Sequence, residues 1–294
     1  MISITNMAQS KSFQRNDTFL SKNHVALNYL EKNNGENVVV FLHGFSLNLF
    51  SWENFHKEII DNTRFYFIDL KGFGFSDKPK NSDYSITEQS NLIIEFLDTK
   101  NIKKFSLVGH SYGGLVSLAI SNEIIRNRID DLEIQKLILL DVPAYKEINP
   151  QFLKVLKNKF LSFFALDVLP TCFITNHTLK RTFYNYKQAK KNHFERYNYF
   201  FKIQGIDYSM RELANQIIPV NIDEIEKSLP LISCPTLIIW GENDELIPLE
   251  YGKKLNKKIN NSILKIIKEC GHVPHEEQML LVKELLINFL KYDI

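Results

Sequence analysis

Cysteine is scarce in this chain, and its few copies form no recognisable site. The 294 residues contain only Cys172, Cys234 and Cys270, which are odd in number, far apart and without C-x-x-C spacing. A disulfide framework or a zinc site would need paired or closely spaced cysteines, so neither is expected. Buried thiols in a reducing compartment are the simpler interpretation. The sequence therefore predicts no metal and no other cofactor.

A large excess of charge of one sign is also missing. The chain has 36 Lys and Arg against 34 Asp and Glu, which gives a net charge of +2. No dense stripe of Lys and Arg lies on one predicted face, so a nucleic-acid-binding protein is not expected.

Long apolar runs are absent as well. No stretch of 18 apolar residues occurs, and the nearest, 160–174, is interrupted by Asp167 and Pro170. The first 16 residues are polar and lack the apolar core of a secretion signal. We therefore expect a cytoplasmic protein without stable membrane insertion. Contact of residues 160–173 with lipid is an alternative that the aromatic side chains there leave open.

Short apolar runs are present instead, and they suit parallel strands covered on both faces. These runs are 38–42, 65–68, 105–108, 137–140, 236–240 and 263–267, the last interrupted by Lys265. Helical patterns fall between them at 86–97, 115–125 and 276–290. The alternation predicts an α/β fold with a doubly wound, mostly parallel sheet.

One segment breaks this alternation. Residues 145–228 contain no clear strand, and aromatic residues and lysines are frequent in them. We predict a helical cap over 145–228, inserted into a core formed by 17–144 and 229–294. Most of its aromatics would form the core of the cap, and a few would line an apolar pocket. Residues 1–16 are predicted to be a flexible tail.

The pentapeptide Gly109-His110-Ser111-Tyr112-Gly113 lies between an apolar run and a helical pattern. This G-x-S-x-G pattern is typical of a nucleophile elbow, in which a sharp turn from strand to helix exposes a serine hydroxyl. Gly109 and Gly113 would leave room for the neighbouring strand and helix. Ser111 is therefore the candidate nucleophile.

A serine hydroxyl is a poor nucleophile without a base and a group that orients the base. Asp244 follows the run 236–240, and His272 follows the run 263–267. Parallel strands place their carboxyl ends at one edge of the sheet, so these loops can converge on Ser111. His272 would accept the serine proton and Asp244 would orient the imidazole. Asp141, at the end of its own strand, is an alternative acid.

The loop His43-Gly44-Phe45-Ser46 follows the run 38–42. In such a fold this loop and the residue after the nucleophile supply the backbone N–H groups of an oxyanion hole. Phe45 and Tyr112 are the corresponding residues. His43, Gly44 and His110 are expected to support the site, with His43 joining loops by hydrogen bonds.

With these motifs the chain resembles the α/β-hydrolase superfamily, in the branch with a helical cap between the sixth and seventh core strands. The resemblance rests on five motifs in family order: His43-Gly44-Phe45, the segment 69–77 (DLKGFGFSD), the elbow, the segment 241–244 (GEND) and the segment 271–276 (GHVPHE). They span about residues 20–290, and the resemblance implies an eight-stranded sheet. It is specific for the superfamily and much less so for a substrate.

Two departures from family patterns narrow the expected chemistry. Members similar to haloalkane dehalogenases and epoxide hydrolases carry aspartate at the elbow, where this chain has Ser111. Members similar to proline iminopeptidases carry a His-Gly-Gly-Pro-Gly loop, where this chain has His-Gly-Phe-Ser. The resemblance thus implies a serine hydrolase that cleaves carboxylic esters of small to medium apolar molecules through an acyl-enzyme.

Alternatives to an esterase remain open at this point. The same three residues could cleave C–C, amide or thioester bonds, because fold does not decide function. A hydrolase-like receptor or scaffold with little turnover is a further alternative. We expect a small-molecule ester or related acyl partner, no nucleic acid, and a monomer or homodimer.

Overall fold

The computed structural model describes residues 13–292 except 54, 56–59, 127, 128, 130 and 149. Its strands are β1 (Asp17–Leu20), β2 (Ala26–Lys32), β3 (Asn37–Leu42), β4 (Thr63–Ile68), β5 (Lys104–His110), β6 (Glu133–Leu140), β7 (Thr236–Gly241) and β8 (Ser262–Ile267). The helices of the core are α1 (Ile86–Thr99), α2 (Tyr112–Ile125), α9 (Leu249–Lys258), α10 (Pro274–Glu277) and α11 (Met279–Lys291). Short 3₁₀ turns are η1 (Leu49–Trp52), η3 (Tyr186–Gln188) and η4 (Leu229–Leu231).

The eight strands form one sheet in the order β1-β2-β4-β3-β5-β6-β7-β8. Strands β3 to β8 run parallel to one another, whereas β1 pairs with β2, and β2 with β4, in antiparallel fashion. This confirms the predicted α/β class and the mostly parallel, doubly wound sheet. The antiparallel pair β1–β2 was not predicted from the apolar runs.

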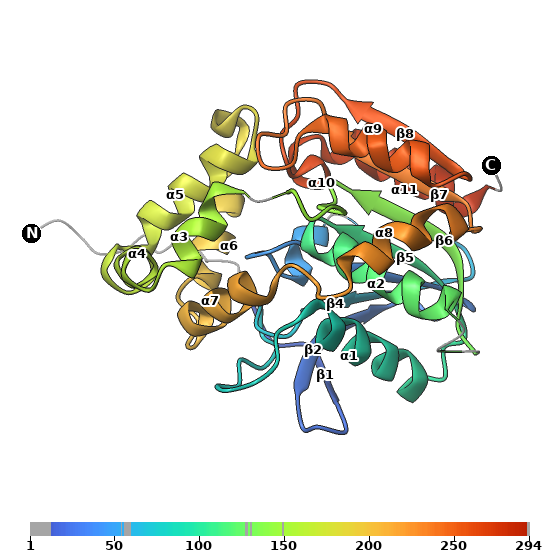
Figure 1. The fold of residues 1–294 in the computed structure, drawn as a ribbon, viewed down its shortest axis with the longest axis horizontal. Coiled ribbons are helices and arrows are strands. Elements are labelled where there is room, and N and C mark those ends of the chain that lie inside the picture. The colour runs from blue at the N-terminus through green and yellow to red at the C-terminus, as the bar shows by residue number, and fades with distance from the viewer. Residues whose placement is uncertain are drawn as a thin grey trace, which may run out of the picture.

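Both faces of the sheet are buried, as runs of consecutive apolar residues require. Along β3 the side chains alternate: Val40 and Leu42 pack into a large cluster with α1 and α2, and Val39 and Phe41 pack into a second cluster with α11. Helices therefore cover the sheet on both sides, and the carboxyl ends of the strands stay open for loops. Figure 1 shows α1 and α2 beside the strands.

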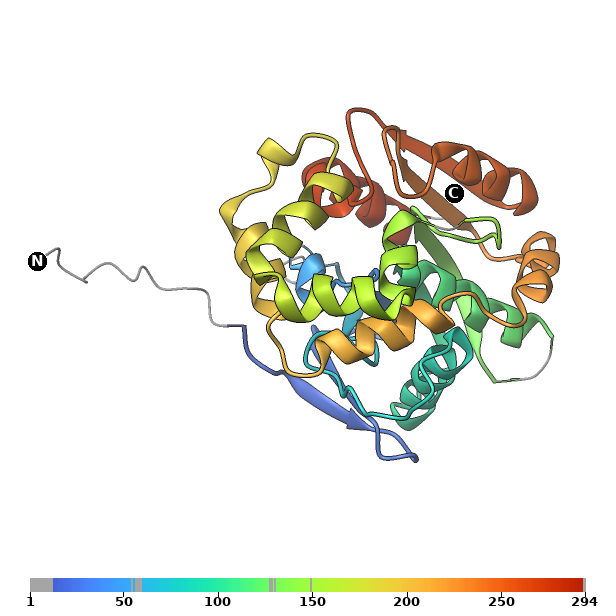
Figure 2. The same ribbon diagram turned by 60° about the vertical axis from the view of Figure 1, so that its left-hand side comes forward.

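The segment 145–228 contains six α-helices and one π-helical turn, which follow β6 and precede β7. They are α3 (Gln151–Lys157), α4 (Lys159–Phe163), the π-helical turn η2 (Phe164–Val168), α5 (Thr171–Thr182), α6 (Lys191–Phe200), α7 (Ile206–Gln216) and α8 (Ile222–Ser228). Helices α3 to α7 gather at one end of the molecule (Figures 1 and 2), and we refer to residues 145–221 as the helical insertion. Helix α8 packs against α2, so it belongs with the helices that cover the sheet.

The predicted tail, residues 1–16, lies outside the described residues as far as residue 12. The four residues that follow are attached to the fold. The ring of Phe13 packs 5.2 Å from that of Phe50 and 5.5 Å from that of Phe200, between centroids. The N–H of Asn16 donates to Oδ1 of Asn28 at 2.7 Å. The tail as predicted therefore does not extend over 13–16, because an aromatic ring anchors this stretch.

In the described part of the chain, no single helix is both long and apolar enough to cross a bilayer. Two consecutive stretches, Lys159–Val168 and Thr171–Thr182, reach the necessary length and apolarity only when taken together, and they bend by 112° at the break between them.

Candidate active site

Ser111 lies between β5 and α2 in a backbone conformation that is rare for a residue with a side chain. Its φ is 49° and its ψ −114°, a strain that typically costs roughly 1–3 kcal/mol. The strain persists because the surrounding backbone is close-packed. A Cβ at Gly113 would lie 2.5 Å from the carbonyl oxygen of Leu42, and one at Gly109 would lie 2.5 Å from Oγ of Ser117. Only glycine fits at either position.

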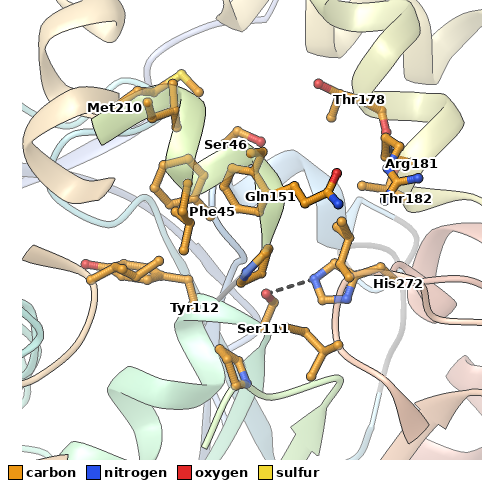
Figure 3. Close-up of a pocket in the computed structure, with 18 of the residues that line it drawn as sticks. Phe45, Ser46, Ser111, Tyr112, Gln151, Thr178, Arg181, Thr182, Met210 and His272 are labelled. Atoms are coloured by element: carbon orange, nitrogen blue, oxygen red, sulfur yellow. Dashed lines mark hydrogen bonds between the residues drawn. The ribbon is translucent and has the colours of Figure 1, made fainter. Parts of the chain in front are cut away.

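Ser111, His272 and Asp244 form a continuous hydrogen-bonded relay. Nε2 of His272 lies 2.9 Å from Oγ of Ser111 (Figure 3), and Nδ1 of the same ring lies 2.7 Å from Oδ2 of Asp244. Oδ1 of Asp244 accepts backbone N–H groups from Leu246 and Ile247 at 2.8 and 3.0 Å. All three side chains are buried. In this arrangement the imidazole can take the serine proton while the carboxylate stabilises the resulting cation.

Asp141, the alternative acid, lies close to the relay without joining it. The nearest oxygen and nitrogen atoms of Asp141, Asp244 and His272 are all within 4.8 Å of one another. Oδ1 of Asp141 accepts the N–H of Gly241 at 2.9 Å. Burial, and next the charge of Asp244, raise the pKa of Asp141 well above its usual range. The neutral carboxyl is therefore the favoured form of Asp141, and Asp244 holds the position that orients His272.

The candidate oxyanion loop lies beside Ser111. A Cβ at Gly44 would be 3.3 Å from Cβ of Ser111 and 2.6 Å from Nδ1 of His110, so the loop backbone approaches the elbow more closely than any side chain would permit. Phe45 follows Gly44 directly, and Tyr112 begins α2. Both lie next to Ser111 in Figure 3. Their backbone N–H groups are the candidate oxyanion donors.

His43 and His110 are held by hydrogen bonds that fix their tautomers. Nε2 of His43 accepts the N–H of Leu70 at 3.0 Å, so Nδ1 carries the proton and donates to the carbonyl of Gly44 at 2.8 Å. Nε2–H of His110 donates to the carbonyl of His272 at 2.7 Å. His43 thus joins two loops, and His110 holds the backbone of the candidate base. Sequence reasoning named both residues but not the contact of His110 with His272.

Buried histidines make the fold sensitive to acid. Burial lowers the pKa of His43 to about 4 and that of His275 to about 3. His275 packs against Trp52 with the ring centroids 4.3 Å apart. In the unfolded chain a histidine titrates near pH 6.5, so unfolding takes up protons as the pH falls below that value. The contribution of these two histidines to the free energy of unfolding is therefore fully present above pH 6.5, and it is lost as the pH falls toward 4.

We expect the free energy of unfolding to fall by roughly 1 kcal/mol per pH unit for each such histidine between pH 6.5 and 4. His275→Phe keeps a flat ring against Trp52 and removes one of these groups. Urea unfolding at pH 5, 6, 7 and 8 should therefore show a shallower slope for this variant. An unchanged slope would mean that His275 titrates alike in the folded and unfolded chains.

A cavity of about 470 Å³ opens above Ser111 between the sheet and the helical insertion. Its wall is mainly apolar, with contributions from Phe45, Tyr112, Phe152, Leu156, Ile217 and Val273. Two permanently charged side chains reach it, and both are paired: Lys146 with Asp223 at 3.1 Å and Arg181 with Glu245 at 2.9 Å. Figure 3 shows Gln151, Thr178 and Thr182 across from Ser111. The cavity therefore favours an uncharged, largely apolar ligand.

The helical insertion is fastened to the loop that carries His272. The backbone N–H of His272 donates to the carbonyl of Thr182 at 2.7 Å. Two residues after the C-terminal end of α5, at Tyr184, the backbone N–H donates to Glu277 at 3.1 Å. Arg196 forms a buried ion pair with Glu276 at 2.5 Å. These contacts were not predicted from the sequence, because each joins segments about 80 residues apart or more.

Among the described residues, Asp141, Asp244 and His272 are the one group of His, Cys, Asp and Glu whose donor atoms are close enough for a metal ion. Their hydrogen bonds already engage Nδ1 of His272, both oxygens of Asp244 and one oxygen of Asp141. The arrangement matches a proton relay better than a coordination sphere, so we assign no metal role to it.

Comparison with known proteins agrees with this architecture. The family model described as alpha/beta hydrolase fold matches residues 37–278. The chain is 26% identical to the uncharacterized hydrolase YugF of Bacillus subtilis, over 88% of this chain and 92% of that one. Its structure is similar to a meta-cleavage product hydrolase of Pseudomonas fluorescens (TM-score 0.77, 20% identity, 94% and 97% of the two chains). It is equally similar to an enol-lactonase of Burkholderia xenovorans (TM-score 0.78, 18% identity, 94% and 100%).

At such identities the two solved structures bear on the fold alone. The family model, in contrast, spans most of the sequence and includes all five motifs. The chain therefore belongs to the α/β-hydrolase family.

Proposed function

We propose that this chain is a serine hydrolase that cleaves uncharged carboxylic esters of small to medium size. The observation that carries the proposal is the relay from Asp244 through His272 to Oγ of Ser111, which ends on the floor of an apolar cavity. Ser111 attacks the ester carbonyl and passes its proton to His272, which returns it to the leaving alcohol. Water, deprotonated by His272, then releases the acid.

The backbone N–H groups of Phe45 and Tyr112 stabilise the oxyanion that forms at each step. One such donor is typically worth about 2.7–4 kcal/mol of transition-state stabilisation. A serine at the elbow supports acyl transfer, because its ester intermediate is readily attacked by water at the carbonyl carbon.

Cleavage of a C–C bond is the second candidate, because the same three residues could serve that reaction on this fold. The cavity favours the ester instead. Lys146 and Arg181, its two permanently charged side chains, are neutralised by Asp223 and Glu245. A substrate bearing carboxylates would find no unpaired Lys or Arg among the described residues of the wall.

A panel of acyl substrates tests the proposal. We expect p-nitrophenyl esters from acetyl to dodecanoyl to be hydrolysed, with kcat/KM highest for short to medium chains because the cavity holds about 470 Å³. The matching p-nitroanilides, thioesters and a β-diketone are expected to react at least tenfold more slowly.

A fluorophosphonate probe run in parallel separates the alternatives. Labelling of Ser111 without turnover of any ester would show that the nucleophile is real and the substrate class wrong. Neither labelling nor turnover would favour a ligand-binding receptor or scaffold.

A further inference from the structure

The helical insertion exposes a group of large apolar side chains on the outside of the molecule. They lie on α4, η2 and the start of α5, and Phe160 is 77% exposed, Phe163 56% and Phe173 63%. We call the exposed residues of this region the α4–α5 patch: Phe160, Leu161, Phe163, Phe164, Val168, Leu169 and Phe173. A single exposed apolar residue is ordinary, but seven within fourteen consecutive positions mark an interaction surface.

The pattern of burial in α4 is the reverse of that expected for a helix of a water-soluble fold. Within this helix Ser162 is buried, and its hydroxyl lies 3.3 Å from Nε of Arg211. Asp167 of η2 also forms an ion pair with Arg211. Polar groups therefore face the protein while phenylalanine and leucine face outward, so packing within this chain does not account for the apolar residues.

Basic residues surround the patch. Residues 151–182 contain Lys154, Lys157, Lys159, Lys180 and Arg181, and their single acidic residue is Asp167. Among the described residues, none of the four lysines has a carboxylate within 4.0 Å, and all four are exposed. The region therefore combines an apolar surface with a local positive charge, the combination that favours an anionic lipid surface.

We propose that the α4–α5 patch docks this protein on the surface of an anionic phospholipid bilayer. The aromatic side chains would enter the interface and the lysines would contact the headgroups. The segment would lie on the bilayer rather than cross it, since the opposite face of α5 is fixed in the protein. Thr175 and Leu179 are buried there, and Ile174 and Thr178 line the cavity.

A second copy of this chain is a less suitable occupant of the patch. A symmetric pair would bring its two sets of lysines together, and like charges facing each other disfavour the contact. An anionic bilayer offers negative headgroups to the lysines and an apolar interior to the aromatic side chains. Because α5 both carries part of the patch and lines the cavity, docking would place the cavity one helix layer from the lipid.

Vesicle flotation with the full chain tests this proposal and does not depend on any chemistry at Ser111. We expect the protein to float with phosphatidylcholine vesicles that contain 30% phosphatidylglycerol and to remain unbound with phosphatidylcholine alone, and we expect salt to weaken the binding. Lys154→Gln with Lys157→Gln should lower the affinity by about fivefold for each lysine. Phe160→Ser with Phe163→Ser should lower it by at least tenfold.

The matched control is Leu280→Ser with Leu281→Ser, which removes two exposed leucines of α11 outside the patch and should leave flotation unchanged. Circular dichroism and thermal unfolding of each variant show that the fold is kept. Failure of the full chain to bind anionic vesicles would overturn the proposal, as would loss of binding in the control alone. A dimer in analytical ultracentrifugation that Phe160→Ser with Phe163→Ser dissociates would assign the patch to a second copy instead.

Discussion

Ser111→Ala is expected to lower kcat for the best ester by about 10⁵- to 10⁶-fold, the largest effect of any single substitution in this chain. The change removes the atom to which the acyl group would be transferred, and it leaves Nε2 of His272 without the hydroxyl that donates to it. Only binding and the oxyanion donors would remain, and these alone give a modest rate above that of water. Steady-state hydrolysis and active-site titration measure the loss.

The substitution should leave the fold intact, because among the described residues the hydroxyl of Ser111 forms a hydrogen bond with His272 alone. Ser121→Ala is the matched control. It makes the same change in α2, where the hydroxyl donates to the carbonyl of Ser117 at 2.9 Å, away from the relay. The control should keep kcat within about threefold. Fluorophosphonate labelling that survives Ser111→Ala would identify a different nucleophile and disprove this assignment.

The strands that build the site could be predicted because each is buried on both faces. The runs 38–42, 105–108 and 236–240 coincide with β3, β5 and β7, and their order fixes where the loops with Gly44, Ser111 and Asp244 emerge. Strand β1 was missed for the opposite reason. Three of the four residues of β1 are exposed, so its sequence carries no apolar run.

Contacts between distant segments could not be predicted from the sequence. The motifs predicted that Ser111, His272 and Asp244 would share one edge of the sheet, but not that His110 would hold the carbonyl of His272. The residues next to His110 in the sequence do not indicate whether its ring is exposed or forms a hydrogen bond with a distant loop. The buried pair of Arg196 and Glu276 is similar, since charged residues are most often solvated and only the packed insertion brings these two together.

The sequence left two candidates for the acid, and the geometry distinguishes them. Asp244→Asn is expected to lower kcat by about 10⁴-fold, the effect typical of an amide in place of the orienting carboxylate. The amide can donate to Nδ1 of His272, which would place the imidazole proton on Nε2, facing Ser111. In this tautomer the ring cannot accept the serine proton. The KM should change little, because Asp244 lies below the cavity and outside its wall.

Asp141→Asn provides the comparison that makes this prediction specific. The raised pKa of Asp141 favours its neutral carboxyl, so a neutral amide of the same shape should preserve kcat within about threefold. Asn can also still accept the N–H of Gly241, the contact that Asp141 makes at 2.9 Å. If instead Asp141→Asn caused the larger loss, Asp141 would be the residue that orients His272. Because both variants replace one carboxyl group of the same buried cluster by an amide, the difference between their rates separates the loss of the hydrogen bond that Nδ1–H donates to Asp244 from the general effect of an amide in this cluster.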